Sequence, residues 1–128
     1  MRRPLVLVAD DEPSVRTLAR RFLELAGYDV LEAADGEAAL SLIQGGNAID
    51  LLIADLAMPG MPGEEMARRA RLARPDLKIL YVSGVIDRLF DDRPQLWEGE
   101  AFLEKPFSSA SLSEAVSLLL FGTTRKPG

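Results

Sequence analysis

The sequence contains no histidine and no cysteine among its 128 residues. Without histidine there is no Ser-His-Asp triad and no Cys-His catalytic pair. Without cysteine there is no thiolate zinc site and no disulfide framework. Any chemistry must therefore come from carboxylates, hydroxyls, lysines, arginines or the backbone.

Long apolar runs are also missing. No stretch approaches the roughly 18 residues that a membrane-spanning helix requires. The apolar run 5–9 is shorter than the roughly 7–15 residues of a signal-peptide core, and acidic residues follow it directly. We therefore expect a cytoplasmic protein with no membrane segment.

Basic residues are fewer than acidic ones, and the formal net charge is −5 at pH 7. Nucleic-acid-binding domains usually carry a basic surface, so we expect no nucleic-acid partner. Hydrophobic residues make up 48% and charged residues 27% of the chain, which is typical of one globular domain with a proper core. We predict a single domain over residues 1–122 and a flexible tail over 123–128.

Short apolar runs alternate with segments of helical periodicity. The predicted strands cover residues 5–9, 28–34, 49–54, 77–82 and 101–104. The predicted helices begin near Pro13, Asp35, Glu64 and Ser111. We expect Ser111 and Glu114 to form a capping box for the last helix, and the pattern of residues 87–100 is ambiguous. The alternation predicts an α/β fold, a single doubly wound five-stranded parallel sheet with helices on both faces.

Polar side chains follow four of the predicted strands. They are Asp10 and Asp11, then Asp55, then Ser83, then Lys105. The carboxyl ends of parallel strands share one edge of the sheet, so these groups should converge there. Three carboxylates in one cleft repel each other, and Mg²⁺ with its oxygen ligands would resolve that conflict. With lysine and hydroxyl added, the set favours a phosphoryl site in which Asp55 is the nucleophile.

Four motifs together resemble the receiver domain of response regulators in two-component signalling. They are Val8–Glu12, Asp55–Pro59 followed by Gly63, Ser83 with Gly84, and Phe102–Phe107. The resemblance covers residues 4–121 and is closest to receivers of hybrid histidine kinases. It implies a flavodoxin-like fold with strand order 2-1-3-4-5.

The resemblance also implies a role for each site residue. Asp55 would accept a phosphoryl group from a phosphohistidine on a sensor histidine kinase or a histidine phosphotransferase. Mg²⁺ would be bound by Asp11, by Asp55 and by the backbone carbonyl of Ala57, whereas Asp10 would act mainly through a bound water. The chain would be a signalling switch that catalyses only its own phosphorylation and dephosphorylation, and it would signal to a downstream protein.

Three further residues complete the implied switch. Lys105 would pair with the phosphoryl oxygens, and Ser83 would hydrogen-bond another of them. Phe102 would then rotate inward. The bond between Lys105 and Pro106 would be cis, which is a minority state among X–Pro bonds.

Each motif also has an ordinary structural explanation. The acids at 10–12 could cap a helix and favour its dipole. Ser83 could make a local turn hydrogen bond, and Phe102 could simply pack in the core. The arginines of the third helix are most simply a solvated face, and these are Arg68, Arg69, Arg71 and Arg74.

The chain departs from the family pattern at several positions. Ala57 and Val85 are apolar where the family often has polar side chains beside the attacking water, so we expect slow hydrolysis of the aspartyl phosphate. Phe102 replaces the commoner tyrosine. Pro94 would break a helix within 87–100, and the apolar residues there could form a partner patch or cover the core. They are Phe90, Leu96 and Trp97.

Three functions are compatible with these residues. The first is a phosphoacceptor switch. The second is a receiver-like scaffold that works without phosphorylation. The third is an aspartate-nucleophile phosphatase, which usually needs a second carboxylate two residues after the nucleophile, where this chain has Ala57.

Overall fold

The computed structural model describes residues 2–84 and 98–122. Its strands are β1 (Leu5–Ala9), β2 (Asp29–Ala33), β3 (Leu51–Asp55), β4 (Lys78–Ser83) and β5 (Glu100–Glu104). Its helices are α1 (Pro13–Leu25), α2 (Gly36–Gln44), α3 (Gly63–Ala73) and α5 (Ser109–Phe121). The ends of these elements lie close to the predicted ones.

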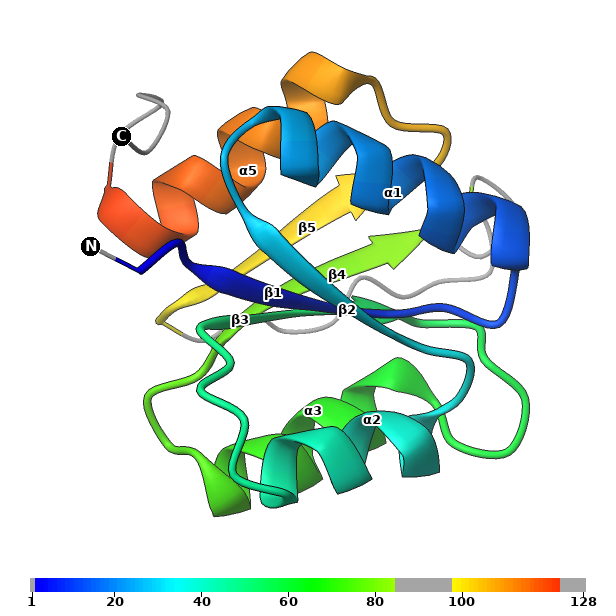
Figure 1. Ribbon diagram of the computed structural model, residues 1–128. Helices are drawn as coiled ribbons and strands as arrows, with labels where there is room; N and C mark the ends of the chain where they lie inside the picture. The colour runs from blue at the N-terminus through cyan, green and yellow to red at the C-terminus, as the bar shows by residue number, and fades with distance from the viewer. Residues whose placement is uncertain (1, 85–97, 123–128) are drawn as a thin grey trace.

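The five strands form one parallel sheet in the order β2-β1-β3-β4-β5. Helices α1 and α5 cover one face, and α2 and α3 cover the other (Figure 1). This arrangement confirms the predicted doubly wound fold and its strand order. The segment 28–34, the most polar predicted strand, corresponds to the edge strand β2.

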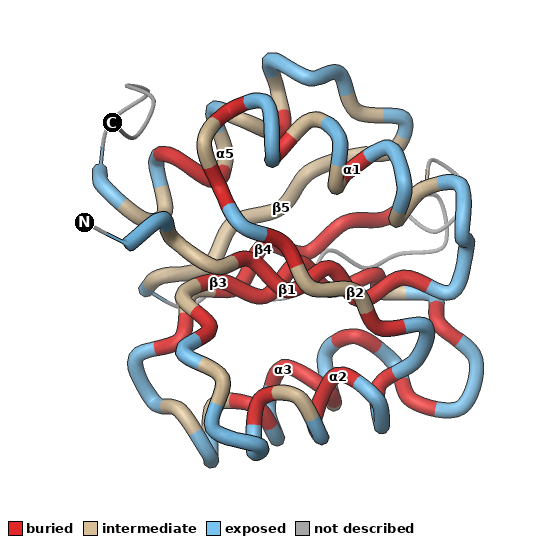
Figure 2. Tube along the Cα trace, in the orientation of Figure 1, coloured by how far each residue is buried: buried red, intermediate tan, exposed pale blue. Residues whose placement is uncertain are grey.

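The core is divided by the sheet into two layers, because successive strand residues point to opposite faces. Leu7, Leu52 and Ile79 lie in the layer beneath α2 and α3. Val6 and Leu80 lie in the layer beneath α1 and α5. Every residue of β3 is buried, whereas every residue of β5 is only partly covered (Figure 2). A functional group at the end of the central strand β3 is therefore more fully enclosed than one at the end of β5.

Local signals explain where two of the helices begin. Pro13 stands in the first turn of α1, where its missing N–H costs no hydrogen bond. The Asp35 carboxylate accepts a hydrogen bond of 2.8 Å from the backbone N–H of Ala38 and so caps α2. Both starts agree with the sequence-based expectation.

The capping box of the last helix differs from the prediction. Its N-cap is Ser108, whose Oγ accepts a 3.0 Å hydrogen bond from the backbone N–H of Ser111. The Ser111 Oγ in turn accepts one of 3.0 Å from the Ser108 N–H. The predicted box of Ser111 with Glu114 is therefore wrong by one helical turn, because a serine takes the place that glutamate or glutamine usually fills.

The arginine-rich face of α3 is only partly solvated, contrary to expectation. Arg68 and Arg69 are exposed and both pair with Glu65, at 2.8 and 2.6 Å. Arg71 pairs with β5, and Arg74 donates hydrogen bonds to carbonyl groups before β3. Two of the four side chains thus fasten α3 to the sheet.

Some predictions concern residues that the structure does not describe. Val85, the patch of Phe90, Leu96 and Trp97, the break at Pro94 and the tail 123–128 all lie outside the described residues. Within residues 2–84 and 98–122, no helix has both the length and the apolar character needed to cross a bilayer.

Candidate functional site

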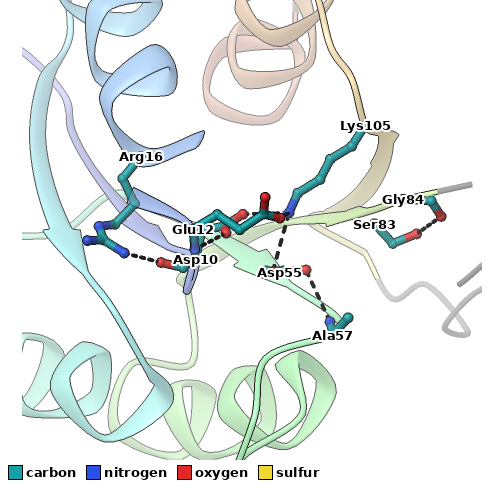
Figure 3. Close-up of polar contacts among 8 residues, drawn as sticks. All are labelled: Asp10, Glu12, Arg16, Asp55, Ala57, Ser83, Gly84 and Lys105. Atoms are coloured by element: carbon teal, nitrogen blue, oxygen red, sulfur yellow. Dashed lines mark hydrogen bonds and ion pairs between the residues drawn. The ribbon is translucent and has the colours of Figure 1, made fainter. Parts of the chain in front are cut away.

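The polar residues at the strand ends meet at the carboxyl edge of the sheet (Figure 3). Asp10 follows β1, Asp55 ends β3, Ser83 ends β4 and Lys105 follows β5. Asp10, Asp55 and Ser83 are almost fully buried, at 1%, 2% and 1% exposure. Burial of charged and polar side chains at one edge of an otherwise apolar sheet is costly unless they have partners.

Three aspartates form the centre of this site. Carboxylate oxygens of Asp10, Asp11 and Asp55 all lie within 4.8 Å of one another. Burial raises the pKa of Asp55 from 3.8 to about 6, and the negative charge of Asp10 adds to this, although Ala57 and Lys105 act in the opposite direction. The protein therefore holds the Asp55 carboxylate in a state that is less stable than in water.

Lys105 is shared between three carboxylates. Its Nζ lies 2.8 Å from Asp10 Oδ2, 3.3 Å from Asp55 Oδ2 and 3.3 Å from Glu12 Oε1. Burial works against the charged lysine, but the hydrogen bond to Asp10 and the charges of Asp55 and Asp10 outweigh it and raise the pKa. The peptide bond to Pro106 is cis, as expected. Lys105 thus stays positively charged beside Asp55.

Glu12 and Arg16 contribute to the site, although sequence reasoning gave neither a role of its own. The Glu12 backbone N–H donates to Asp10 Oδ1 at 2.9 Å, and its carboxylate reaches Lys105. Arg16 donates to the backbone carbonyl of Asp10 at 2.6 Å. The three adjacent acids 10–12 were a visible signal for Glu12. The Arg16 contact is a backbone contact, so no sequence pattern marked it.

The backbone after β3 also holds the nucleophile candidate. The N–H of Ala57 donates to Asp55 Oδ1 at 3.1 Å, so one carboxylate oxygen faces the loop and the other faces Lys105. The Ser83 hydroxyl is turned towards the carbonyl oxygen of Gly84, 3.4 Å away (Figure 3).

The acid cluster fits a hard divalent cation. Asp10, Asp11, Glu12 and Asp55 carry four carboxylates, which one lysine cannot neutralise. The buried Asp10 Oδ2 has the Lys105 ammonium group, 2.8 Å away, as its charged neighbour. Clustered carboxylates with water access suit Mg²⁺, which prefers oxygen ligands and keeps several waters. Asp11 is exposed at the mouth of the cluster and leaves that access open.

The predicted switch residue Phe102 lies on β5, two residues from Glu100, whose side chain is only 2% exposed. Phe102 is partly buried against the core layer beneath α2 and α3, and it pairs in register with Tyr81 of β4. The Tyr81 hydroxyl donates to Glu100 at 3.3 Å, and Arg71 of α3 lies 3.2 Å from the same carboxylate oxygen. Burial raises the pKa of the Tyr81 hydroxyl most, and the negative charge of Glu100 raises it further. Phe102 therefore borders a polar cluster that links α3, β4 and β5.

Comparison with known proteins places this site in a family. The model of the response regulator receiver domain matches residues 6–117. Sensor kinase CckA of Brucella abortus (strain 2308) is 36% identical over 116 residues, which are 90% of this chain and 12% of CckA. The response regulator receiver protein CpdR of the same strain is 32% identical over 115 residues, which are 90% of this chain and 95% of CpdR. The chain thus spans a small part of one relative and nearly all of the other.

A solved structure agrees with these relatives. The response regulator protein TrrA of Thermotoga maritima, in complex with Mg²⁺-BeF, superposes with a TM-score of 0.78 and is 35% identical. The match covers 91% of this chain and 99% of TrrA. The chain therefore belongs to the family of response regulator receiver domains, the signalling modules of two-component systems.

Proposed function

We propose that this chain is a phosphoacceptor switch in which Asp55 takes a phosphoryl group from a phosphohistidine on a partner protein. The observation that carries the proposal is the position of Asp55. Its carboxylate is buried at the end of the central strand, with Asp10 and Asp11 on one side and Lys105 Nζ 3.3 Å away. The raised pKa of Asp55 means that an ionised carboxylate is poorly stabilised in the resting protein.

The proposed transfer is an in-line displacement at phosphorus. A carboxylate oxygen of Asp55 forms the new P–O bond while the P–N bond to the partner's imidazole breaks, and the imidazole keeps that electron pair and then takes a proton. Lys105 balances charge on the phosphoryl oxygens, which share it in the transition state. A bound Mg²⁺ would neutralise further charge on those oxygens.

The chain's other site residues would have distinct tasks. Asp11, Asp55 and the carbonyl of Ala57 would bind the metal directly, and Asp10 would bind it through water. The Ser83 hydroxyl would leave Gly84 and donate to a phosphoryl oxygen. Movement of Ser83 would free space beside β4 and so couple the site to Phe102.

The proposal extends to partners and boundaries. We place the receiver domain at residues 1–122, with a tail at 123–128. The donor would be a sensor histidine kinase or a histidine phosphotransferase in the cytoplasm. The output would be a contact with a downstream protein, and neither nucleic acid nor membrane would be a partner.

The test is phosphorylation by a small acyl phosphate. The wild-type chain is incubated with acetyl phosphate and MgCl₂, and intact mass spectrometry counts added phosphoryl groups. We expect one group on the wild type and none on Asp55→Asn. Asp76→Asn is the matched control, because Asp76 is an exposed aspartate outside the site, and it should be modified like the wild type.

The two alternative functions give different results in the same experiment. Absence of an adduct on the folded wild type would favour a scaffold that works without phosphorylation. Rapid turnover of phosphate esters would favour a phosphatase, although Ala57 lacks the carboxyl group that such enzymes usually use as the general acid. An adduct on Asp55→Asn equal to that on the wild type would overturn the assignment of Asp55.

A further inference from the structure

Arg16 contacts the backbone of the acid cluster from α1. Its guanidinium donates a 2.6 Å hydrogen bond to the carbonyl oxygen of Asp10 (Figure 3). The Asp10 N–H donates in turn to the carbonyl of Ala33 on β2, at 3.1 Å. The main chain of Asp10 is therefore held on both sides, at the point where β1 passes into the acidic turn.

A second contact fixes the direction of the Arg16 side chain. Arg16 Nε lies 3.4 Å from Glu32 Oε1 on β2, and the Arg16 side chain is only 17% exposed. Glu32 is itself held by Arg20, whose Nε lies 2.6 Å from Glu32 Oε2. Arg20 also pairs with Glu24 at 3.2 Å. Glu32 thus pairs with both arginines through different carboxylate oxygens, and of the two only Arg16 also contacts Asp10.

The hydrogen bond from Arg16 bears on Asp11 as well as on Asp10. The carbonyl of Asp10 and the N–H of Asp11 belong to one rigid peptide plane, so holding the carbonyl fixes the rotation of that plane. The plane in turn sets the direction in which the Asp11 side chain leaves the backbone. Asp11 is exposed and is the least enclosed of the three clustered aspartates, so it has most to gain from a fixed backbone.

We infer that Arg16 is a positioning residue that sets the Mg²⁺ affinity of the acid cluster by orienting the peptide between Asp10 and Asp11. This inference rests on the proposed function, because it takes the cluster to be a metal site. Residues that orient metal ligands commonly change affinity by about 10–100-fold when they are replaced. Glu32 pairs with Arg16 and offsets its charge, so the orienting effect should exceed the repulsion between the guanidinium and the cation.

The experiment is a calorimetric titration of MgCl₂ into four versions of the full chain. They are the wild type, Arg16→Gln, Arg16→Lys and Arg20→Gln. Arg16→Gln should weaken Mg²⁺ binding by about tenfold, and Arg16→Lys, which keeps a charge and a donor, should lie in between. Arg20→Gln is the matched control, because Arg20 holds Glu32 without touching Asp10, and its Kd should stay within about twofold of the wild type.

Urea unfolding in the presence of a chelator measures the stability of each variant without bound metal, and so detects a purely structural role of Arg16. Arg16→Gln and Arg20→Gln each lose an ion pair with Glu32, so a general loss of stability should appear in both, whereas a loss of Mg²⁺ affinity should appear only at position 16. If Arg16→Gln does not fold, Arg16→Lys takes its place: it should lose Mg²⁺ affinity relative to the wild type, whereas Arg20→Gln should not.

Three results would overturn the inference. The first is a Kd for Arg16→Gln within about twofold of the wild-type value. The second is a tighter Kd, which would show that charge repulsion dominates. The third is a loss of Mg²⁺ affinity in Arg20→Gln equal to that in Arg16→Gln. A wild-type chain that binds no Mg²⁺ would instead contradict the proposed function, so the two failures are distinguishable.

Discussion

A Cβ atom on Gly63 would lie 2.9 Å from the carbonyl carbon of Asp55, and closer still to its carbonyl oxygen. The first residue of α3 therefore packs directly on the backbone of the proposed phosphoacceptor. The neighbour is main chain and not a flexible side chain, so it cannot move aside without shifting the end of β3.

Gly63→Ala should destabilise the protein by about 1–3 kcal/mol, as overpacking of a tight site commonly does. It should also slow phosphorylation by acetyl phosphate, because Asp55 must shift. Urea unfolding and intact mass spectrometry measure the two effects. Glu64→Ala is the neighbouring control at an exposed position, and equal stability of the two variants would contradict the packing argument.

The raised pKa of Asp55 predicts how stability depends on pH in the absence of Mg²⁺. Burial, followed by the charge of Asp10, raises the pKa from 3.8 to about 6, so the folded protein favours the protonated form. Ionising Asp55 therefore costs nothing below pH 3.8, costs progressively more up to pH 6, and has its full cost above pH 6. A shift of this size corresponds to roughly 3 kcal/mol at most.

Asp55→Asn cannot ionise and should be more stable than the wild type at pH 8 in the presence of a chelator. The stability gained by Asp55→Asn over the wild type should shrink between about pH 6 and about pH 4 and disappear at lower pH. Urea unfolding at a series of pH values measures it, with Asp76→Asn as the control for an exposed aspartate. A gain that does not change with pH would show that ionisation of Asp55 is not the cause.

The buried carboxylate of Glu100 predicts a stability effect away from the phosphoryl site. Its side chain is 2% exposed and holds both Arg71 and Tyr81. Glu100→Ala should cost about 3 kcal/mol, because it leaves a guanidinium without its buried partner, whereas Tyr81→Phe should cost about 1 kcal/mol. Urea unfolding measures both, and Glu114→Ala, at an exposed position on α5, should change stability little. A Glu100→Ala variant as stable as Glu114→Ala would rule out a structural role for the cluster.

The lifetime of the aspartyl phosphate should depend on residue 57. Ala57 is exposed beside Asp55 and has no side-chain group that could position an attacking water. Ala57→Asn supplies such a group and should shorten the lifetime several-fold, which the decay of the phosphorylated mass after removal of acetyl phosphate would measure. Ala57→Val adds bulk without hydrogen bonding and is the control. An unchanged lifetime in Ala57→Asn would contradict the expectation.

The strand ends show why so much of the site could be predicted. Asp10, Asp55, Ser83 and Lys105 each follow an apolar run, and parallel strands place such positions at one edge. The rule needs only the strand–helix alternation, which is local in the sequence. It says nothing about which carboxylate oxygen faces which donor.

Contacts made by long side chains account for what was missed. Arg71 was expected in solvent but pairs with Glu100, and Arg16 was given no role but holds the Asp10 carbonyl. Both depend on how far a long side chain reaches across packed elements. The misplaced capping box at Ser111 has a different cause, since Ser111 occupies the N3 position of the box, where glutamate or glutamine is usual.

The sequence by itself determined the fold class, the strand order through the family resemblance, and the set of residues that converge at the carboxyl edge. Apolar periodicity is a local property that predicts strands and helices, and their alternation favours a parallel sheet whose strand ends share one edge. The tertiary structure alone decided that Lys105 bridges Asp10, Glu12 and Asp55 and that burial raises the pKa of Asp55. Distances, desolvation and charge coupling arise only when distant segments exclude water from the same place.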